Sequence, residues 1–344
     1  MPKGSIPVLV AGIGGASLGT EVIKSLMQAG IYSVFGCDIS PYAFGHYQGG
    51  IAGSLVVKRE NYAESLLDLC TSHEIRVVIP GGEEPASLLS ESASLFREAG
   101  IHLAMNSQDV VAVSSDKKRL FERLKELGIP IPLTVAVSDM AEYSVAPSYP
   151  VVIKPTTGSG GSSLVFIASN PDEERWFVKY LLNNGRTALV QEYIAPDEGE
   201  FTVGVLSLPD RRVVGSVAMR RLFNAKLSVL IKTEAGVISS GYSQGLIDDF
   251  PEVQARAEEI AKKSGSVGPM NIQGRVRDGV LIPFEINARF SASTYLRAMA
   301  GFNEVDLYLR HVLLGEHPAA PRIRPGYYLR SLSEVAVGKE EIKQ

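Results

Sequence analysis

The sequence feature that most constrains the fold is a change of pattern near residue 113. Before it, short apolar runs alternate with segments of helical spacing. "IPVLVAGIGG" runs into glycines, and the next segment has apolar residues at helical spacing from Val22 to Met27 and ends at Gly30. Further strands and helices alternate up to residue 113. Strands alternating with helices predict a parallel α/β sheet, so we expect a Rossmann-like domain over residues 1–113.

Strands dominate the sequence beyond residue 113. A helix predicted over "SSDKKRLFERLKELG" is followed by strand-like runs such as "PVVIKP", "EFTVGVLSL" and "LIPFEINA", with helical spacing only at about 171–183 and 251–264. This pattern predicts an α+β region with a small lobe over 114–188 and a larger lobe over 189–330. Residues 331–344 read as a weakly ordered tail.

Composition narrows the class of protein. The 344 residues are 45% hydrophobic and 21% charged, with a net charge of −4, which is ordinary for a soluble globular chain and unlike a general nucleic-acid binder. No run approaches the length of a membrane span. Cys37 and Cys70 lie in apolar segments without metal-ligand spacing. We therefore expect a cytoplasmic protein whose partners are small molecules, not nucleic acid or a membrane.

The run "VVIKPTTGSGGSSLVF" combines one cation with a glycine-rich loop. Glycines leave backbone N–H groups free to bind oxyanions, and Lys154 at the strand end adds a positive charge. In a Walker A loop the lysine follows the glycines, whereas here it precedes them and a strand follows. The pattern predicts a lid over a polyphosphate. The alternative is a flexible hairpin with a solvated lysine.

A second segment, "NIQGRVRDGVLIPFEINAR", predicts a β-hairpin with metal ligands. Glu285 and Asn287 lie two apart on a strand, so they share one face and offer the oxygen ligands that Mg²⁺ accepts. A two-residue turn at 278–279 would put Gln273 on the opposite face from Glu285. A three-residue loop, 278–280, would place the two directly opposite, and we expect that register. The alternative is an amphipathic hairpin with solvated polar residues.

These segments occur within a longer ordered set of motifs. A "DK" at a helix start, "VIKP" with its glycine loop, "QEYI", "GEFTVGV" and "FEINAR" together resemble the ATP-grasp superfamily, in the branch similar to the carbamoyl-phosphate synthase large subunit. The resemblance covers about residues 1–330 and implies an ATP-grasp fold preceded by a Rossmann-like domain. The chain has one such unit and no glutaminase signature, so we do not expect it to make carbamoyl phosphate.

The resemblance implies roles for individual residues in binding ATP and metal. The nucleotide-binding residues are Lys117 and Lys154 for the phosphates, Ser159, Gly160, Gly161 and Ser162 for the covering loop, Glu192 and Ile194 for the adenine hinge, and Glu200 for the ribose. The implied ligands of two Mg²⁺ ions, with Mn²⁺ as a substitute, are Gln273, Glu285 and Asn287.

The resemblance also implies a reaction. Arg289 would lie where the transferred phosphoryl group meets the substrate carboxylate, with Lys154 and Arg220 as the other catalytic cations. Arg221, Lys226 and Lys232 are the alternatives to Arg220. The implied enzyme is an ATP-dependent carboxylate–amine (or thiol) ligase. It would form an acyl phosphate and then an amide from amino-acid-like substrates, with release of ADP and phosphate. Relatives of this kind are often homodimers.

Two other functions stay open at the level of sequence. "GIGGASLG" follows a strand and Asp38 ends the next strand, as in a nicotinamide-dependent oxidoreductase, although the spacing is not GxGxxG. A non-catalytic ATP-binding module is the other alternative, and intact metal ligands argue against it. In "PGGEEP", Glu83 or Glu84 could contact a substrate amine or simply face water.

Overall fold

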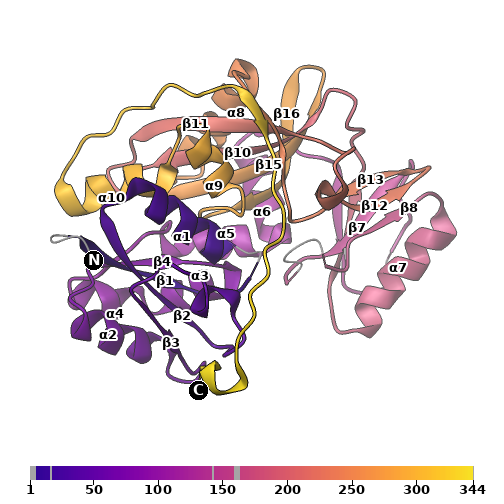
Figure 1. Ribbon diagram of the computed structural model, residues 1–344. Helices are drawn as coiled ribbons and strands as arrows, with labels where there is room; N and C mark the ends of the chain where they lie inside the picture. The colour runs from indigo at the N-terminus through magenta and orange to yellow at the C-terminus, as the bar shows by residue number, and fades with distance from the viewer. Residues whose placement is uncertain (1–4, 16–17, 142, 159–162, 344) are drawn as a thin grey trace.

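The computed structural model describes residues 5–15, 18–141, 143–158 and 163–343. The predicted loop residues Ser159, Gly160, Gly161 and Ser162 lie outside this part of the chain. Figure 1 shows three regions: an N-terminal domain, a central large sheet with its helices, and a smaller lobe that carries α7. Within the described residues, no helix combines the length and the apolar character that a bilayer crossing requires.

The N-terminal domain is a parallel sheet with helices packed against it, as the sequence predicts. Its strand order is β3-β2-β1-β4-β5, so the order reverses direction between β1 and β4. The strands are β1 (Ile6–Ala11), β2 (Tyr32–Asp38), β3 (Gly53–Val56), β4 (Val77–Pro80) and β5 (His102–Leu103). The helices are α1 (Leu18–Ala29), η1 (Phe44–His46), α2 (Tyr62–Ser72), α3 (Glu83–Glu91), α4 (Ala93–Glu98) and α5 (Gln108–Ser115).

The smaller lobe contains a four-stranded antiparallel sheet, which we call the lid sheet, in the order β6-β9-β7-β8. Apolar residues of α7, such as Val178 and Leu181, pack against Val151 and Ile153 of this sheet. Its elements, with the helix α6 that precedes it, are α6 (Lys117–Glu126), β6 (Thr134–Val137), β7 (Val151–Pro155), β8 (Phe166–Ala168), α7 (Pro171–Asn183) and β9 (Ala188–Glu192).

The six-stranded large sheet has the order β16-β15-β10-β11-β14-β17. Its strands are β10 (Glu200–Ser207), β11 (Val213–Arg221), β14 (Gly245–Ile247), β15 (Pro269–Arg277), β16 (Val280–Asn287) and β17 (Gly326–Tyr328). The helices of this region are α8 (Pro251–Lys263), α9 (Thr294–Met299) and α10 (Glu304–Leu314). The segment η3 (Lys226–Ser228) leads into a separate hairpin of β12 (Val229–Thr233) and β13 (Gly236–Ser239), which lies beside the lid sheet in Figure 1. The short helix η4 (Lys339–Glu341) lies near the C-terminus.

Strand alternation gives the large sheet two different faces. One face packs against α8, where Phe201 and Ile272 meet Ile260 in a buried cluster. The other face carries polar side chains on β15 and β16 and apolar side chains toward β11 and β14. Because a glutamate or arginine is rarely buried without a partner or a ligand, the polar half of this face is a candidate functional site.

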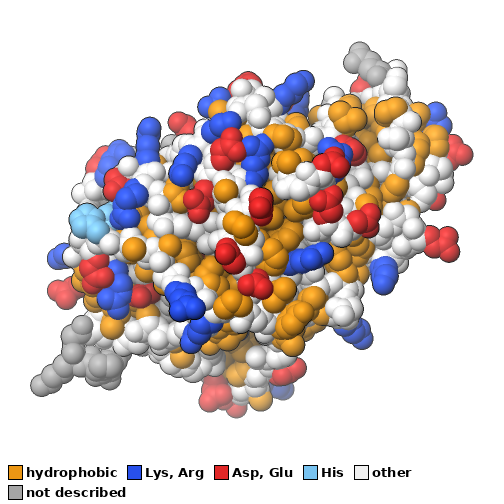
Figure 2. Space-filling model, turned by 90° about the horizontal axis from the view of Figure 1, so that it is seen from above, with side chains coloured by type: hydrophobic (Ala, Val, Ile, Leu, Met, Phe, Trp, Pro, Cys, Tyr) orange, Lys and Arg blue, Asp and Glu red, His pale blue; other side chains and the backbone are white. Residues whose placement is uncertain are grey.

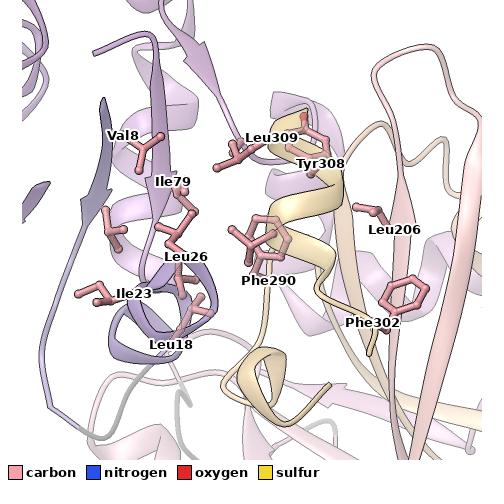
Figure 3. Packing of buried hydrophobic residues seen from close by; sticks show 14 of the residues in the cluster. Val8, Leu18, Ile23, Leu26, Ile79, Leu206, Phe290, Phe302, Tyr308 and Leu309 are labelled. Carbon is pink, nitrogen blue, oxygen red and sulfur yellow. The ribbon is translucent and has the colours of Figure 1, made fainter. Parts of the chain in front are cut away.

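The N-terminal domain and the large sheet share one hydrophobic core. Leu26 of α1 and Ile79 of β4 belong to the same buried cluster as Phe290, Phe302 and Tyr308 (Figure 3). Burial of each such side chain contributes roughly 1.5–3 kcal/mol, so this cluster holds the two domains together strongly. The ends of β1 and β4 are thereby placed over the polar face of the large sheet.

The segment after β17 returns to the N-terminal domain, as its yellow trace in Figure 1 shows. At its end the Lys343 backbone N–H donates to the Tyr47 hydroxyl, 3.0 Å away. Figure 2 shows basic and acidic side chains interspersed on the upper face of the molecule, as expected for a chain with a net charge of only −4.

Candidate active site

The hairpin of β15 and β16 corrects one sequence prediction and confirms its consequence. The loop has two residues, Asp278 and Gly279, both with positive φ (53° and 74°), and Arg277 pairs with Val280. The expected three-residue loop is therefore wrong. Gln273 nevertheless pairs directly with Glu285. A β-bulge explains this pairing. Gln273 pairs with Glu285 and Gly274 with Pro283, so one residue of β16 between them is unpaired and the side chains beyond it change face.

The bulged residue is Phe284, and its free carbonyl has a specific partner. Lys154, at the end of β7, donates from Nζ to this carbonyl at 3.1 Å and to Gln191 Oε1 at 2.9 Å. The ammonium also lies 5.7 Å from the ring centroid of Phe121 and 5.9 Å from that of Phe284. A lysine of the lid sheet is thus held against a strand of the large sheet.

Burial, together with the nearby charge of Lys117, lowers the pKa of Lys154 to about 7, although Glu285 acts in the opposite direction. Lys117 begins α6. Asp116 caps that helix by accepting from the Lys118 backbone N–H at 2.8 Å, and the Lys117 backbone N–H donates to the end of β7. Helix and strand are therefore joined where the two predicted phosphate lysines stand.

Glu285 is half-buried and ionised. Burial alone would raise its pKa, but Lys117, a hydrogen bond from Asn287, Lys154 and Arg289 together hold the pKa below the usual value for glutamate. The Asn287 Nδ2 donates to Glu285 Oε1 at 3.1 Å. One carboxylate thus lies among cations from the lid sheet, from α6 and from the segment after β16.

A first pocket of about 680 Å³ lies between the lid sheet and the large sheet. Apolar side chains from both sheets and from β13 line it, together with the backbone from 191 to 194. Lys117, Lys154, Gln273 and Glu285 stand at one end. A largely apolar pocket with a few convergent charges is typical of a small-molecule site.

The predicted hinge residues Glu192 and Ile194 line this pocket, and each has partners within the protein. Glu192 accepts from the Leu133 backbone N–H at 3.0 Å and pairs with Arg277 at 2.5 Å. The Ile194 carbonyl accepts from Arg275 at 2.6 Å. The segment is therefore held firmly in position.

Glu200, also in the first pocket, lies between two buried arginines that we did not assign from sequence. Arg275 Nε is 2.8 Å from Glu200 Oε2, and Arg221 Nε is 3.6 Å from Glu200 Oε1. Arg275 also donates to the carbonyl of Val237 at 2.7 Å. Strand alternation could have identified Arg275, because it lies two residues from Gln273 on β15 and shares its face.

The structure assigns the basic segment of β11 differently from our prediction. Arg220 is exposed and lies on the same face as Ala218, which packs in the core around α8. Arg221 is buried on the opposite face, where its guanidinium donates to the Ser240 carbonyl at 2.6 Å and to Gln273 at 3.4 Å. The sequence alone does not distinguish Arg220 from Arg221, because the difference depends on which face of β11 packs against α8. The residue at the site is Arg221, not Arg220.

A second pocket, of about 1120 Å³, adjoins the first and shares Gln273 and Glu285 with it. Most of its lining residues are polar or charged, and they include Arg221, Arg289, serines of two loops, and Glu83 of the N-terminal domain. The crevice where the strand order of that domain reverses thus opens onto the large sheet, as is usual for ligand sites in parallel sheets.

Arg289 lies at the boundary of the two domains. Its Nη2 is 3.0 Å from Glu83 Oε1 and 3.3 Å from Asn287 Oδ1. Glu84, the other acidic candidate, pairs with Arg59 at 2.7 Å and does not line the second pocket. Of the two glutamates, Glu83 is therefore the one in a position to meet a substrate.

The predicted metal ligands come together, and their chemistry suits a hard cation. Gln273, Glu285 and Asn287 offer one carboxylate and two amide oxygens on one face of the hairpin. Among the described residues, no group of three or more His, Cys, Asp or Glu could hold an ion by itself. The set fits Mg²⁺, which commonly takes few protein ligands and completes its shell with water and phosphate oxygens.

The glycines of the first βα turn are explained by packing. A Cβ at Gly19 or at Gly81 would lie 1.9 Å from the carbonyl oxygen of Gly12. The Asp38 carboxylate, which could otherwise receive a ribose, accepts from the backbone N–H of Ile13 at 2.8 Å. Close contact between two turns requires these glycines, so the turn no longer favours the nicotinamide alternative.

Comparison with known proteins agrees with this geometry. The arginine-specific large chain of carbamoyl phosphate synthase from Geobacillus stearothermophilus is 25% identical over 315 residues, covering 84% of this chain and 28% of that protein. The chain spans only about a quarter of the length of such curated relatives.

Solved structures share the fold at low identity. The L-amino acid ligase from Bacillus licheniformis matches with a TM-score of 0.66 and 14% identity, covering 90% of this chain and 74% of that one. The biotin carboxylase domain of 2-oxoglutarate carboxylase from Hydrogenobacter thermophilus, solved with MgADP, ADP and bicarbonate, gives 0.64 and 20%, covering 93% and 73%.

A family model described as an ATP-grasp domain matches residues 114–293, from the end of α5 through both pockets to the loop after β16. This match covers more than half of the chain, and the five-stranded parallel sheet followed by antiparallel sheets is the architecture of the matched structures. The chain therefore belongs to the ATP-grasp family of ligases.

Proposed function

We propose that this protein is an ATP-dependent ligase that joins a carboxylate to an amine, or less commonly to a thiol, through an acyl phosphate. The observation that carries the proposal is the meeting of two different pockets at Gln273 and Glu285. One is largely apolar, and the other is lined mostly by polar residues, including two arginines. Such an arrangement can present the end of a triphosphate to a second, charged substrate.

In this proposal the first pocket binds ATP. The apolar walls enclose adenine beside the backbone of residues 192–194, and Glu200 contacts the ribose. Its Oε1 is buried without a hydrogen-bond partner among the described residues, which supports that role. Lys117 and Lys154 bind the phosphates.

Gln273, Glu285 and Asn287 would hold two Mg²⁺ ions against the phosphates. The metal neutralises charge on the β- and γ-phosphates when it is bound. The protein would supply one carboxylate and two amide oxygens to these ions, so water and nucleotide oxygens would complete their coordination.

The second pocket would bind the carboxylate and the nucleophile. Arg289 and Arg221 orient the carboxylate so that its oxygen attacks the γ-phosphorus, giving an acyl phosphate and ADP. Glu83 binds the amine, whose nitrogen then attacks the acyl carbon. The C–N bond forms, phosphate leaves, and the nitrogen loses a proton. The N-terminal domain covers one side of the second pocket and limits the access of water, which would hydrolyse the acyl phosphate.

The polar lining of the second pocket and the similarity to an L-amino acid ligase support amino-acid-like substrates. A screen of ADP release with Mg²⁺, ATP, amino acids and small carboxylates tests the proposal. We expect at least one carboxylate–amine pair to raise ADP release well above the rate with ATP alone.

The matched variants are Glu285→Ala and Glu84→Ala. Glu285→Ala should abolish ADP release with the best pair, whereas Glu84→Ala, on the surface, should keep it. Full activity in Glu285→Ala would show that the metal assignment is wrong.

Thermal melting separates the remaining alternatives. ATP with Mg²⁺ should raise the melting temperature, because Lys117 and Lys154 in the first pocket can receive a triphosphate. NAD(H) should not, because the Asp38 carboxylate that would bind its ribose already accepts from the Ile13 backbone N–H. Tight ATP binding without turnover for every nucleophile in the screen would instead indicate a non-catalytic module.

A further inference from the structure

A buried ion pair lies directly behind the second pocket, and the chemistry proposed above does not use it. Arg297 of α9 is 1% exposed, and its Nη1 is 3.1 Å from Glu304 Oε1. Glu304, equally buried, also accepts from the Thr294 hydroxyl at 2.6 Å. Burying an arginine is costly, so its remaining contacts are informative.

The second half of the guanidinium reaches the floor of the pocket. Arg297 Nη2 donates to Asn271 Oδ1 at 2.6 Å and to Thr202 Oγ1 at 3.2 Å. The Thr202 hydroxyl in turn donates to the same Asn271 oxygen at 2.9 Å. Asn271 and Thr202 both line the second pocket beside Arg221. The ion pair is thus connected to the pocket surface through one asparagine.

The backbone leaves room for this arrangement. Gly204 of β10 lies under the guanidinium, and a Cβ there would be 2.3 Å from Arg297 Nη1 and 2.8 Å from Glu304 Oε2. A side chain at residue 204 would displace the pair, so the glycine in "EFTVGV" is explained by this contact.

These contacts determine which way the Asn271 amide points. Its Oδ1 receives two donors, one of them charged. In the reversed orientation the NH₂ group would face the guanidinium, and two donors would oppose each other. The amide therefore keeps its oxygen against Arg297 and directs its NH₂ group toward the pocket.

We infer that Arg297 is a positioning residue that locks Asn271 as a hydrogen-bond donor in the second pocket, so that Asn271 binds an oxygen of the carboxylate substrate. The identity of that ligand rests on the proposed function; the orientation of the amide does not. With Arg221 and Arg289, Asn271 makes this end of the pocket selective for an oxyanion over an ammonium group.

The first test is Asn271→Asp. The aspartate has nearly the same shape and keeps both hydrogen bonds from Arg297 and Thr202, but it presents an anionic oxygen where the NH₂ group was. We expect the KM for the best carboxylate in the screen to rise at least tenfold, with ATP affinity within twofold of wild type. Thr202→Val, which removes one donor but leaves Arg297 in place, should change KM less than threefold. An unchanged KM in Asn271→Asp would overturn the inference.

The second test needs no turnover. In protein labelled with ¹⁵N-asparagine, the Asn271 side-chain signal is identified by its loss in Asn271→Ser. Its NH₂ protons should exchange with water freely and shift when sodium acetate is added in the presence of MgADP. Protected protons with no shift would show that the amide faces Arg297 and would refute the inference. The expected shift together with no ligase activity would support the inference and refute the proposed function.

Discussion

The depressed pKa of Lys154 predicts that nucleotide binding takes up a proton. With a pKa of about 7, roughly nine-tenths of the free protein carries a neutral Lys154 at pH 8. Phosphate oxygens placed against the amine favour its charged form. Binding of MgATP at pH 8 should therefore be accompanied by the uptake of about 0.9 protons.

The energetic scale follows from the same value. The shift from the ordinary pKa of 10.5 to about 7 corresponds to a free-energy cost on the order of 5 kcal/mol. This is the stability that the folded protein loses when Lys154 is charged. Because the folded-state pKa is lowered, the unfolded chain binds more protons between pH 7 and 10.5. Lys154 therefore makes folding stability rise with pH across that window. Below pH 7, where the amine is charged in both states, its full destabilising effect on the folded protein is present.

Isothermal titration calorimetry measures the proton uptake. The binding enthalpy of MgATP at pH 8, plotted against the ionisation enthalpy of several buffers, should have a slope whose magnitude corresponds to about 0.9 protons. Lys154→Met is the control, since it removes the amine and keeps much of the side-chain length, and its slope should be near zero. Between pH 7 and 9, the stability of wild type relative to Lys154→Met in urea should rise by about 2.3 kcal/mol. A wild-type slope near zero, or the same slope in Lys154→Met, would refute the reasoning.

Three further predictions concern stability, each measured by urea unfolding. Arg221→Met should lower the free energy of unfolding by about 3–5 kcal/mol, because it removes one of the two cations beside the buried Glu200. Arg220→Met, on the surface, should change it by less than about 0.5 kcal/mol. Equal effects would contradict the assignment of the two arginines to opposite faces. Glu174→Ala removes the buried acceptor of two tyrosine hydroxyls and a backbone N–H, so we expect a loss of about 3 kcal/mol and faster hydrogen exchange over residues 143–149. Gly81→Ala should cost about 3 kcal/mol through its clash with a neighbouring carbonyl, while Gly49→Ala, with open space around it, should be tolerated; similar costs would contradict the packing explanation.

Much of the fold follows from local periodicity. The alternation of strands and helices up to residue 113 predicts the parallel sheet, because a buried strand and an amphipathic helix each leave a pattern within a few residues of sequence. The same rule places Glu285 and Asn287 on one face of a strand and Lys154 at a strand end. These predictions need no knowledge of what packs against the element.

The remaining features depend on contacts between distant segments. Periodicity alone does not reveal the bulge at Phe284, yet this bulge brings Gln273 opposite Glu285 and releases the carbonyl that holds Lys154. The choice of Arg221 over Arg220 depends on which face of β11 meets α8.

The charge state of Lys154 likewise depends on burial by Phe121 and Phe284, which lie far from it in the sequence. Sequence by itself determined which residue types stand on which elements, since that information is local. Only the tertiary structure decided their register, burial and protonation, because desolvation and charge interactions act between neighbours in space.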